Sequence, residues 1–181
     1  MDNYKKICRN INIKNRKELP INEVRAKSKI ITSKLISIIE DMNVSNICSY
    51  MPIKNEVDTT IFNQYIIEYG YKLYLPKIVC GKMRFFAVDT LNSLKKGSFD
   101  VLEPIEKDEL NIEDKKIVIV PLVGYDPNRR RLGYGKGYYD RFFSNDKNSY
   151  FIGLAYKFQK CEKFFDDYDL QCHQIITEDI I

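Results

Sequence analysis

Apolar residues in the first part of the chain are spaced as they are in amphipathic helices. Tyr4, Ile7, Cys8 and Ile11 recur at helical intervals, which predicts a short helix over residues 2–13. Pro20 favours the start of a second, longer helix that ends at about Met42. The stripe that would pack this second helix against a core consists of Val24, Ile30, Ile31, Leu35 and Ile39.

Short apolar runs follow and alternate with helical segments. They predict strands at residues 46–51, 71–75, 83–88, 117–120, 150–156 and 174–177. Between the first two strands, residues 58–68 have a helical pattern with Ile61, Tyr65 and Ile66 inward. Asp58 would cap this helix and Gly70 would end it. A strand, a helix and a strand in this order predict a βαβ unit with a right-handed parallel crossover.

The run from Ile117 to Val120 is apolar at every position, as in a central parallel strand that helices cover on both faces. The whole pattern predicts an α/β fold of three layers, αβα. Its central sheet would be mostly parallel, open and Rossmann-like. Residues 94–104 are expected to form a loop with a turn at Gly97 and Ser98. The segment from Asp166 to Asp169 is interpreted as a functional loop.

Length and composition favour one domain. The chain has 181 residues, of which 44% are hydrophobic and 30% charged, so we expect a single domain over residues 1–181. The longest apolar run, residues 117–123, is far shorter than the roughly 20 residues of a membrane helix. Five cysteines without a C-x-x-C pair indicate free thiols in a reducing compartment. We therefore expect a cytoplasmic protein, acting as a monomer and without a membrane partner.

Charge is distributed unevenly although the net charge is only +4. Basic residues gather in the first 29 residues and acidic residues in the last 21. An anionic ligand between the two ends would explain this pattern, and so would ordinary solvated helix faces. The run from Arg129 to Arg131 is compatible with an RNA contact, but no aromatic–basic interleaving accompanies it. We expect no nucleic-acid partner. A single histidine, His173, excludes a Ser-His-Asp triad and a histidine-based zinc site.

The clearest chemical pattern follows the predicted central strand. Gly133, Gly135 and Gly137 alternate with other residues, so the backbone can approach a ligand and point its N–H groups at an anion. The next residues, 138–143, have helical character, which would place the glycines at a helix N-terminus. The pattern is neither of the two common nucleotide fingerprints. Gly137 stands where a Walker A loop needs Ser or Thr, and Tyr138 where a dinucleotide fold needs glycine.

Two further pairs of residues are candidates for ligand contact. Met51 and Glu56 follow the first predicted strand, and ligands of open α/β sheets bind at the carboxyl ends of strands. The alternative is that Met51 is core and Glu56 favours the dipole of the next helix. Lys5 and Arg9 are four residues apart on the first helix, so both could reach one polyphosphate or simply form an exposed basic face.

The segment RLGYGKGYYD, from Arg131 to Asp140, together with Pro121 upstream, resembles the signature of the 5-formyltetrahydrofolate cyclo-ligase family, also called methenyltetrahydrofolate synthetases. The basic pair, the Glu-Val-Asp-Thr loop that begins at Glu56, and a late aspartate, Asp169, follow the family order. The sequence departs from the family pattern at four positions. Met51 directly precedes Pro52, Ser98 separates Gly97 from Phe99, and Tyr168 and His173 stand where the family has His and Asp.

The resemblance implies an ATP-dependent cyclisation of 5-formyltetrahydrofolate to 5,10-methenyltetrahydrofolate, through phosphorylation of the formyl oxygen, with release of ADP and phosphate. It implies an ATP site formed by Lys5, Arg9, Arg131, Gly133, Tyr134, Gly135, Lys136, Gly137, Tyr138 and Tyr139. It implies folate contacts from Met51, Glu56, Tyr134 and Tyr138. Lys136, Tyr138 and Arg131 would serve catalysis, and Asp140 and Asp169 would hold Mg²⁺, which prefers carboxylates and retained waters. Two alternatives stay open, namely an ATP-using enzyme acting on another formyl or amide compound, and an RNA-binding module.

Overall fold

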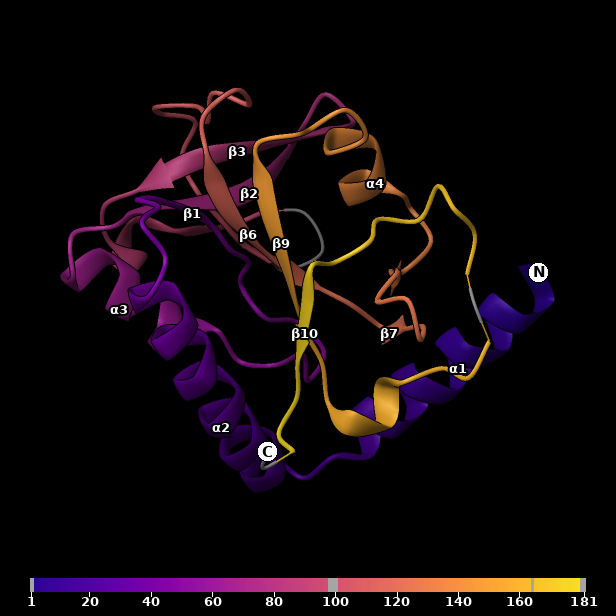
Figure 1. Ribbon diagram of the computed structural model, residues 1–181. Coiled ribbons are helices and arrows are strands. Elements are labelled where there is room, and N and C mark those ends of the chain that lie inside the picture. The colour runs from indigo at the N-terminus through magenta and orange to yellow at the C-terminus, as the bar shows by residue number, and fades with distance from the viewer. Residues whose placement is uncertain (1, 98–100, 164, 180–181) are drawn as a thin grey trace.

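The computed structural model describes residues 2–97, 101–163 and 165–179. A central sheet of six strands has the order β10-β9-β6-β1-β2-β3 (Figure 1). Its strands are β1 (Asn46–Cys48), β2 (Lys72–Val79), β3 (Lys82–Val88), β6 (Lys116–Pro121), β9 (Ser149–Leu154) and β10 (Gln174–Ile176). Neighbouring strands are parallel except for β2 and β3. The prediction of an α/β fold around a mostly parallel sheet is confirmed.

Strand β3 runs antiparallel to β2 because the turn between them allows an immediate return. Cys80 and Gly81 both have positive φ, 48° and 76°, as a two-residue hairpin of this kind requires. The hairpin also explains why β2 extends past the predicted end at Leu75, since Val79 still pairs with Lys82. Strand β1 is shorter than predicted and ends at Cys48, where the chain leaves the sheet to form the loop before the next helix.

Helices cover both faces of the sheet, and the described residues contain α1 (Asp2–Glu18), α2 (Ile21–Glu40), α3 (Thr60–Glu68) and α4 (Tyr138–Phe142). Helices α2 and α3 pack on one face, where their apolar residues meet Ile117 and Ile119 of β6. The other face carries Val118 and Val120, and there α4 and the aromatic residues around Phe143 provide the cover. Strand β6 is therefore buried on both faces, as its sequence predicts. The third layer is thin because α4 has only five residues.

Helix α3 differs in detail from the prediction. Ile61, expected inward, is 72% exposed, whereas Phe62 and Ile66 are buried. Thr59 occupies the N-cap position without a side-chain capping hydrogen bond, and Asp58, one residue earlier, accepts a hydrogen bond from the backbone N–H of Thr60 at 2.9 Å. The predicted end is confirmed, since Gly70 follows the helix with φ +79°.

Helix α1 is longer than predicted and buries a face that shares only Cys8 with the predicted stripe among its buried positions. Ile7 and Ile11, which suggested the packing side, are 47% and 52% exposed. The buried positions are Lys5, Cys8, Asn12 and Arg16, again at helical spacing. The hydrophobic pattern fails here because most of the buried stripe is polar. Two cations, Lys5 and Arg16, consequently point into the protein from opposite ends of one helix.

Small elements complete the described fold. They are β4 (Lys95–Lys96), β5 (Leu102–Glu103), β7 (Gly124–Tyr125), β8 (Arg131–Leu132) and two 3-10 helices, Leu91–Ser93 and Lys157–Gln159. Strands β4 and β5 pair where the 94–104 loop was expected, and of its predicted turn Ser98 lies outside the described residues. Strand β7 pairs with β8, which leads into the glycine segment.

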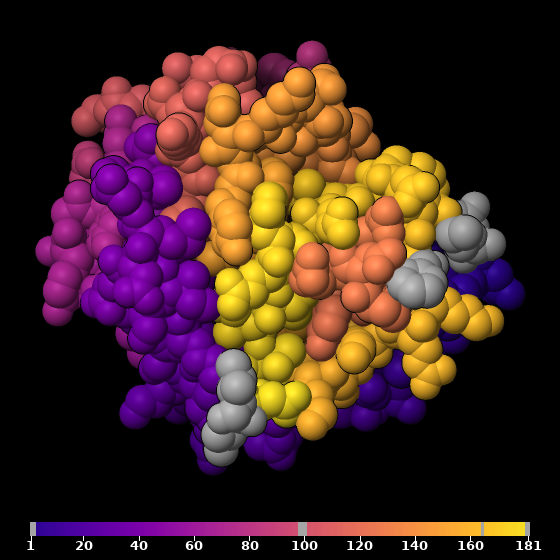
Figure 2. Space-filling view, in the orientation of Figure 1, coloured from indigo at the N-terminus to yellow at the C-terminus, as the bar shows by residue number. Residues whose placement is uncertain are grey.

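The chain after β10 lies beside α2 (Figure 2), where Lys27 Nζ is 2.8 Å from Glu178 Oε1. This contact ties the end of the described chain to the helical layer. Among the described residues, no helix combines the length and the apolar character that a membrane crossing needs.

Candidate active site

A cavity of about 570 Å³ lies at the carboxyl edge of the sheet. Its walls include the loop after β1 and the loop after β6, two neighbouring parallel strands. In the sheet, β2 lies next to β1 on one side of the β1–β6 pair, and β9 lies next to β6 on the other side. The connections that leave β1 and β6 therefore diverge. Such a switch point is where open α/β sheets bind their ligands.

The cavity brings together all the site residues predicted from the sequence. Those on its walls are Lys5, Arg9, Met51, Glu56, Arg131, Gly133, Tyr134, Gly135, Lys136, Gly137, Tyr138, Tyr139, Asp140 and Asp169. They come from four places in the chain, namely α1, the loop after β1, the segment from β8 into α4, and the loop before β10. Their meeting in one cavity supports the grouping, and the role of each stays a prediction.

The glycines of the loop are required by its geometry. Gly135 and Gly137 have φ +96° and +63°, which other residues rarely adopt. A Cβ on Gly133 would approach a guanidinium nitrogen of Arg131 to 2.5 Å, and the Gly133 carbonyl accepts a hydrogen bond from Arg9 Nε at 2.9 Å. Helix α4 is too short for a large dipole, so the positive character of this wall comes mainly from the cationic side chains.

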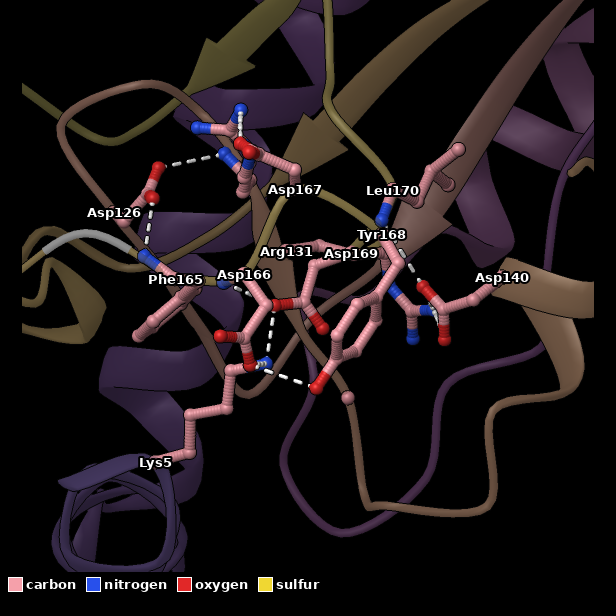
Figure 3. A network of polar contacts seen from close by, with 12 residues as sticks. Lys5, Asp126, Arg131, Asp140, Phe165, Asp166, Asp167, Tyr168, Asp169 and Leu170 are labelled. Atoms are coloured by element: carbon pink, nitrogen blue, oxygen red, sulfur yellow. Dashed lines mark hydrogen bonds and ion pairs between the residues drawn. The ribbon is translucent and has the colours of Figure 1, made fainter. Parts of the chain in front are cut away.

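Figure 3 shows a polar network where α1 meets the loop before β10. Lys5 Nζ lies 2.6 Å from Asp166 Oδ2 and also pairs with Asp169. Tyr168 donates a hydrogen bond to Asp166, and its ring lies over the ammonium group. Burial would lower the pKa of Lys5, but the hydrogen bonds that Lys5 donates to the two carboxylates outweigh burial and leave the pKa raised. The pKa of Asp166 is lowered, chiefly by its hydrogen bond with Lys5.

Arg131 and Asp140 form the neighbouring part of this network. Arg131 Nη1 lies 3.5 Å from Asp140 Oδ2, and Asp140 Oδ1 accepts the backbone N–H of Leu170 at 3.2 Å. The guanidinium carbon of Arg131 stands 4.8 Å from the centre of the Tyr139 ring. Its Nε is buried and has no hydrogen-bond partner among the described residues. This wall therefore holds a cation with unused donor capacity.

Asp140 and Asp169 fit a magnesium ion that arrives with phosphate. The bond from Leu170 to Asp140 places the two aspartates on the same side of the cavity. Within the described ranges, no group of three or more His, Cys, Asp and Glu residues could hold a metal by itself. Magnesium in phosphate-using enzymes needs only one or two carboxylates, because waters and phosphate oxygens supply the rest. The donor set therefore suits a metal shared with a nucleotide.

A second network joins the loop after β1 to the glycine loop. Glu56 is 5% exposed; it accepts the Ile53 backbone N–H at 3.1 Å, and its Oε1 is 3.7 Å from Arg16 Nη1. Burial raises the pKa of Glu56, and Arg16 is the main group that opposes this. Tyr134 accepts a hydrogen bond from Arg16 Nη2, and burial raises the pKa of Tyr134 to about 12. Near them, Met51 presents its thioether to the cavity and accepts a hydrogen bond from Asn63 at 3.5 Å.

Sequence reasoning missed Arg16 entirely. Its signal was present, because Arg16 stands eleven residues after Lys5 and four after Asn12, on the face of α1 that is buried. The predicted helix ended at residue 13, before Arg16, and its polar face was interpreted either as a phosphate contact or as an exposed basic surface. The cavity also has lining residues from the β2–β3 hairpin that no motif indicated, among them Pro76, Lys77 and Met83.

An open parallel sheet, a glycine loop flanked by cations at its switch point and a deep cavity beside it define an α/β enzyme of the nucleotide-using class. A family model described as the 5-formyltetrahydrofolate cyclo-ligase family matches residues 2–178. The chain belongs to the 5-formyltetrahydrofolate cyclo-ligase family. The predicted family, fold class and enzymatic nature are thereby confirmed.

Individual relatives agree with this membership. A 5-formyltetrahydrofolate cyclo-ligase of Mycoplasma genitalium is 32% identical over 150 residues, covering 81% of this chain and 81% of that protein. A solved 5,10-methenyltetrahydrofolate synthetase of Aquifex aeolicus is 32% identical with a TM-score of 0.83, covering 97% of this chain and 90% of that one. The corresponding protein of Mycoplasma pneumoniae is 26% identical with a TM-score of 0.78, covering 97% and 99%.

Proposed function

We propose that this chain catalyses the ATP-dependent cyclisation of 5-formyltetrahydrofolate to 5,10-methenyltetrahydrofolate, with release of ADP and phosphate. The observation that carries the proposal is one cavity with two chemically different walls. One wall is a glycine loop with the cations Lys5, Arg9 and Arg131, and the other carries the buried carboxylate of Glu56. Family membership agrees with this division into a nucleotide side and a folate side.

The nucleotide side supplies positive charge from several elements. Lys5 and Arg9 are one turn apart on α1, and both face the cavity. Lys136 lies on the glycine loop, whose left-handed glycines keep the backbone free of side chains at this wall. A polyphosphate bound here would be neutralised from two directions, which is the main task in phosphoryl transfer. We assign the ATP phosphates to this side.

The folate side suits a flat heterocycle with several N–H donors. An ionised carboxylate accepts hydrogen bonds only, so Glu56 matches the amino and ring N–H groups of the pterin. Met51 offers a polarisable apolar contact on the same wall. Tyr134 and Tyr138 of the glycine segment also line the cavity, and we assign them to folate as well as nucleotide. Tyr138 would contact the formyl end.

The reaction has to turn the formyl oxygen into a leaving group. Transfer of the ATP γ-phosphoryl group to this oxygen forms an O–P bond and releases ADP. The second folate nitrogen then attacks the formyl carbon, the carbon–oxygen bond breaks, and phosphate leaves. This sequence needs orientation of two substrates and neutralisation of charge more than covalent help. Arg131 and Lys136 are the side chains that we assign to that neutralisation.

Magnesium would be held by Asp140 and Asp169 together with the nucleotide. It would neutralise phosphate charge, as it does in other phosphoryl-transfer enzymes. Ion pairs hold the two carboxylates in place: Lys5 pairs with Asp169, and Arg131 pairs with Asp140.

We further propose that one domain carries the whole site and acts as a cytoplasmic monomer. All the walls of the cavity come from segments around one sheet. The five cysteines, which all lie in the described part of the chain, are free thiols, in keeping with a reducing compartment.

The test is the absorbance of the methenyl product after mixing the protein with 5-formyltetrahydrofolate and Mg²⁺, with and without ATP. We expect a rise that requires ATP and that Asp140→Ala abolishes. Asp167→Ala is the matched control, because the side chain of Asp167 is 95% exposed and is assigned no role. ATP consumption without the absorbance rise would keep the nucleotide side and refute folate as the substrate. Absence of both would refute the proposed function.

A further inference from the structure

Arg16 lies at the C-terminal end of α1 and is only 1% exposed. It is not among the residues that line the cavity, yet every group that its guanidinium reaches belongs to a segment that does. Its Nε donates to the Lys54 carbonyl at 3.2 Å and its Nη1 to the Leu122 carbonyl at 3.5 Å. Nη1 also pairs with Glu56, and Nη2 donates to the Tyr134 hydroxyl. One side chain thus joins three segments of the cavity wall from behind.

The surroundings hold Arg16 itself in place. Asn55 donates hydrogen bonds to the carbonyls of Arg16 and Leu19, at 2.9 and 3.3 Å, so the end of α1 is fixed to the loop that carries Glu56. Burying a cation lowers the stability of the fold unless the cation is paired. Even a paired one usually stabilises the fold no more than an apolar side chain of similar size. The planar fork of arginine instead offers donors in several directions at once. The arrangement is therefore suited to orienting groups.

We propose that Arg16 is a positioning residue for the folate: it holds the carboxylate of Glu56 and the hydroxyl of Tyr134 in the orientation that receives the pterin ring. The inference rests on the proposed function, because it assigns the Glu56 wall to folate. It goes beyond that function by giving a role to a residue outside the cavity.

The charges around Glu56 show what Arg16 contributes. Arg16 from α1 and Arg131 from β8 are the cations that favour the ionised form of Glu56, along with the Ile53 N–H and the Tyr134 hydroxyl. Tyr50, Tyr134 and Tyr139 are the other titratable groups that face it. Without Arg16, burial would raise the pKa of Glu56 further, so that more of it is protonated near neutral pH. A protonated carboxyl is a poorer partner for the N–H donors of a pterin.

Arg16 reaches the glycine loop only through the Tyr134 hydroxyl, and it is far from Lys5, one of the proposed phosphate contacts. It lies eleven residues after Lys5 on one continuous helix, a separation of about 16 Å along the axis. Changes at Arg16 should therefore affect folate and leave ATP alone, which a general loosening of the fold would not do.

The experiment measures KM for 5-formyltetrahydrofolate and for ATP between pH 6 and 8, in wild type, Arg16→Gln, Arg16→Lys and the control Lys17→Gln. Lys17 is the exposed neighbour of Arg16 on the same helix. In Arg16→Gln the folate KM should rise by about tenfold for each pH unit below the new pKa of Glu56, because the ionised fraction falls by that factor. The KM for ATP should match wild type. Arg16→Lys keeps the charge, so its folate KM should be several-fold higher without the pH dependence.

The inference is overturned by a folate KM in Arg16→Gln that does not depend on pH, or by a KM for ATP that rises in parallel. If Arg16→Gln does not fold, Arg16→Lys decides: a raised folate KM with an unchanged KM for ATP supports the inference, and two unchanged values refute it. A wild-type protein that forms no methenyl product refutes the proposed function, and the inference falls with it. An active wild type with no folate-specific loss in the variants refutes the inference alone.

Discussion

The two ends of α1 carry ion pairs of the same chemistry in different surroundings. At the first end is the rim network, which consists of Lys5, Arg131, Asp140, Asp166 and Asp169. At the other end is the buried network, formed by Arg16, Glu56 and Tyr134. Each pairs a cation of the helix with a carboxylate from a later loop. In the rim network the side chains of Asp166 and Asp169 are 16% and 15% exposed, whereas that of Glu56 is 5% exposed.

Access to water decides what each network can do. A pair that water reaches can exchange partners, so Lys5 can leave its aspartates for a phosphate and a metal can replace it. A pair without water has no such exchange, because an unpaired buried charge costs several kcal/mol. The rim network is therefore suited to binding and release of a charged ligand. The buried network is suited to holding a fixed receptor for a neutral ring.

The largest effect should come from breaking the buried network. Arg16→Met leaves Glu56 buried without its closest cation and should lower the free energy of unfolding by about 3 kcal/mol. Chemical denaturation at neutral pH measures this. The double variant Arg16→Met/Glu56→Gln should recover part of the loss because no unpaired charge remains. Lys14→Met, on an exposed position of the same helix, is the control. Equal losses in the single and the double variant would show that the pair is not coupled.

In the rim network we expect the opposite division between stability and activity. Asp140→Asn keeps an acceptor for the Leu170 N–H and removes the charge that faces Arg131 and the proposed metal. Turnover should fall on the order of 100-fold, while the free energy of unfolding stays nearly unchanged. Asp167→Asn, at an exposed position beside this network, should leave both quantities as in wild type. A loss of stability in proportion to the loss of turnover would contradict the comparison.

The comparison also shows which parts of the site a sequence can reveal. The glycine loop was predictable because its chemistry is local. Its alternate glycines, its lysine and the aspartate in the first turn of the following helix are neighbours in the chain. The position of Met51 and Glu56 beside the cavity followed from the rule that ligands bind at the carboxyl ends of strands, together with the family resemblance. The sheet followed from apolar runs such as Ile117–Val120, whose burial on both faces the structure confirms.

The face of α1 could not be predicted in this way. The hydrophobic pattern favoured Ile7 and Ile11, and those side chains are half exposed. Lys5 and Arg16 are buried because their partners, Asp169 and Glu56, come from loops 164 and 40 residues away along the chain. Tertiary pairing of charges leaves no periodic apolar signal, so the pattern alone does not distinguish a functional polar stripe from a solvated one. Strand β3 was predicted from its apolar run, but its antiparallel direction was not, because that direction depends on the turn at Cys80 and Gly81.

A smaller effect should show whether Lys5 and the proposed magnesium ion compete for the same aspartates. In Lys5→Met, Asp166 and Asp169 lose their shared cation, so the protein without nucleotide should bind Mg²⁺ about tenfold more tightly. Affinity for ATP should fall in the same variant, because a phosphate contact is lost. Isothermal titration with Mg²⁺ alone and then with ATP measures both. Lys6→Met, at the exposed neighbouring position, is the control. Unchanged Mg²⁺ affinity would mean that Lys5 and the metal do not compete.

The smallest effect tests whether the buried network acts through the Tyr134 hydroxyl as well as through the charge of Arg16. Tyr134→Phe removes the acceptor of Arg16 Nη2 and leaves the ring in place. Loss of this part-buried hydrogen bond should lower the free energy of unfolding by about 1 kcal/mol at most. The folate KM should rise a few-fold without new pH dependence, because Glu56 keeps Arg16. Tyr69→Phe, which removes an exposed hydroxyl, is the control. If Tyr134→Phe instead gave the pH dependence expected of Arg16→Gln, the tyrosine and not the arginine would control the charge of Glu56.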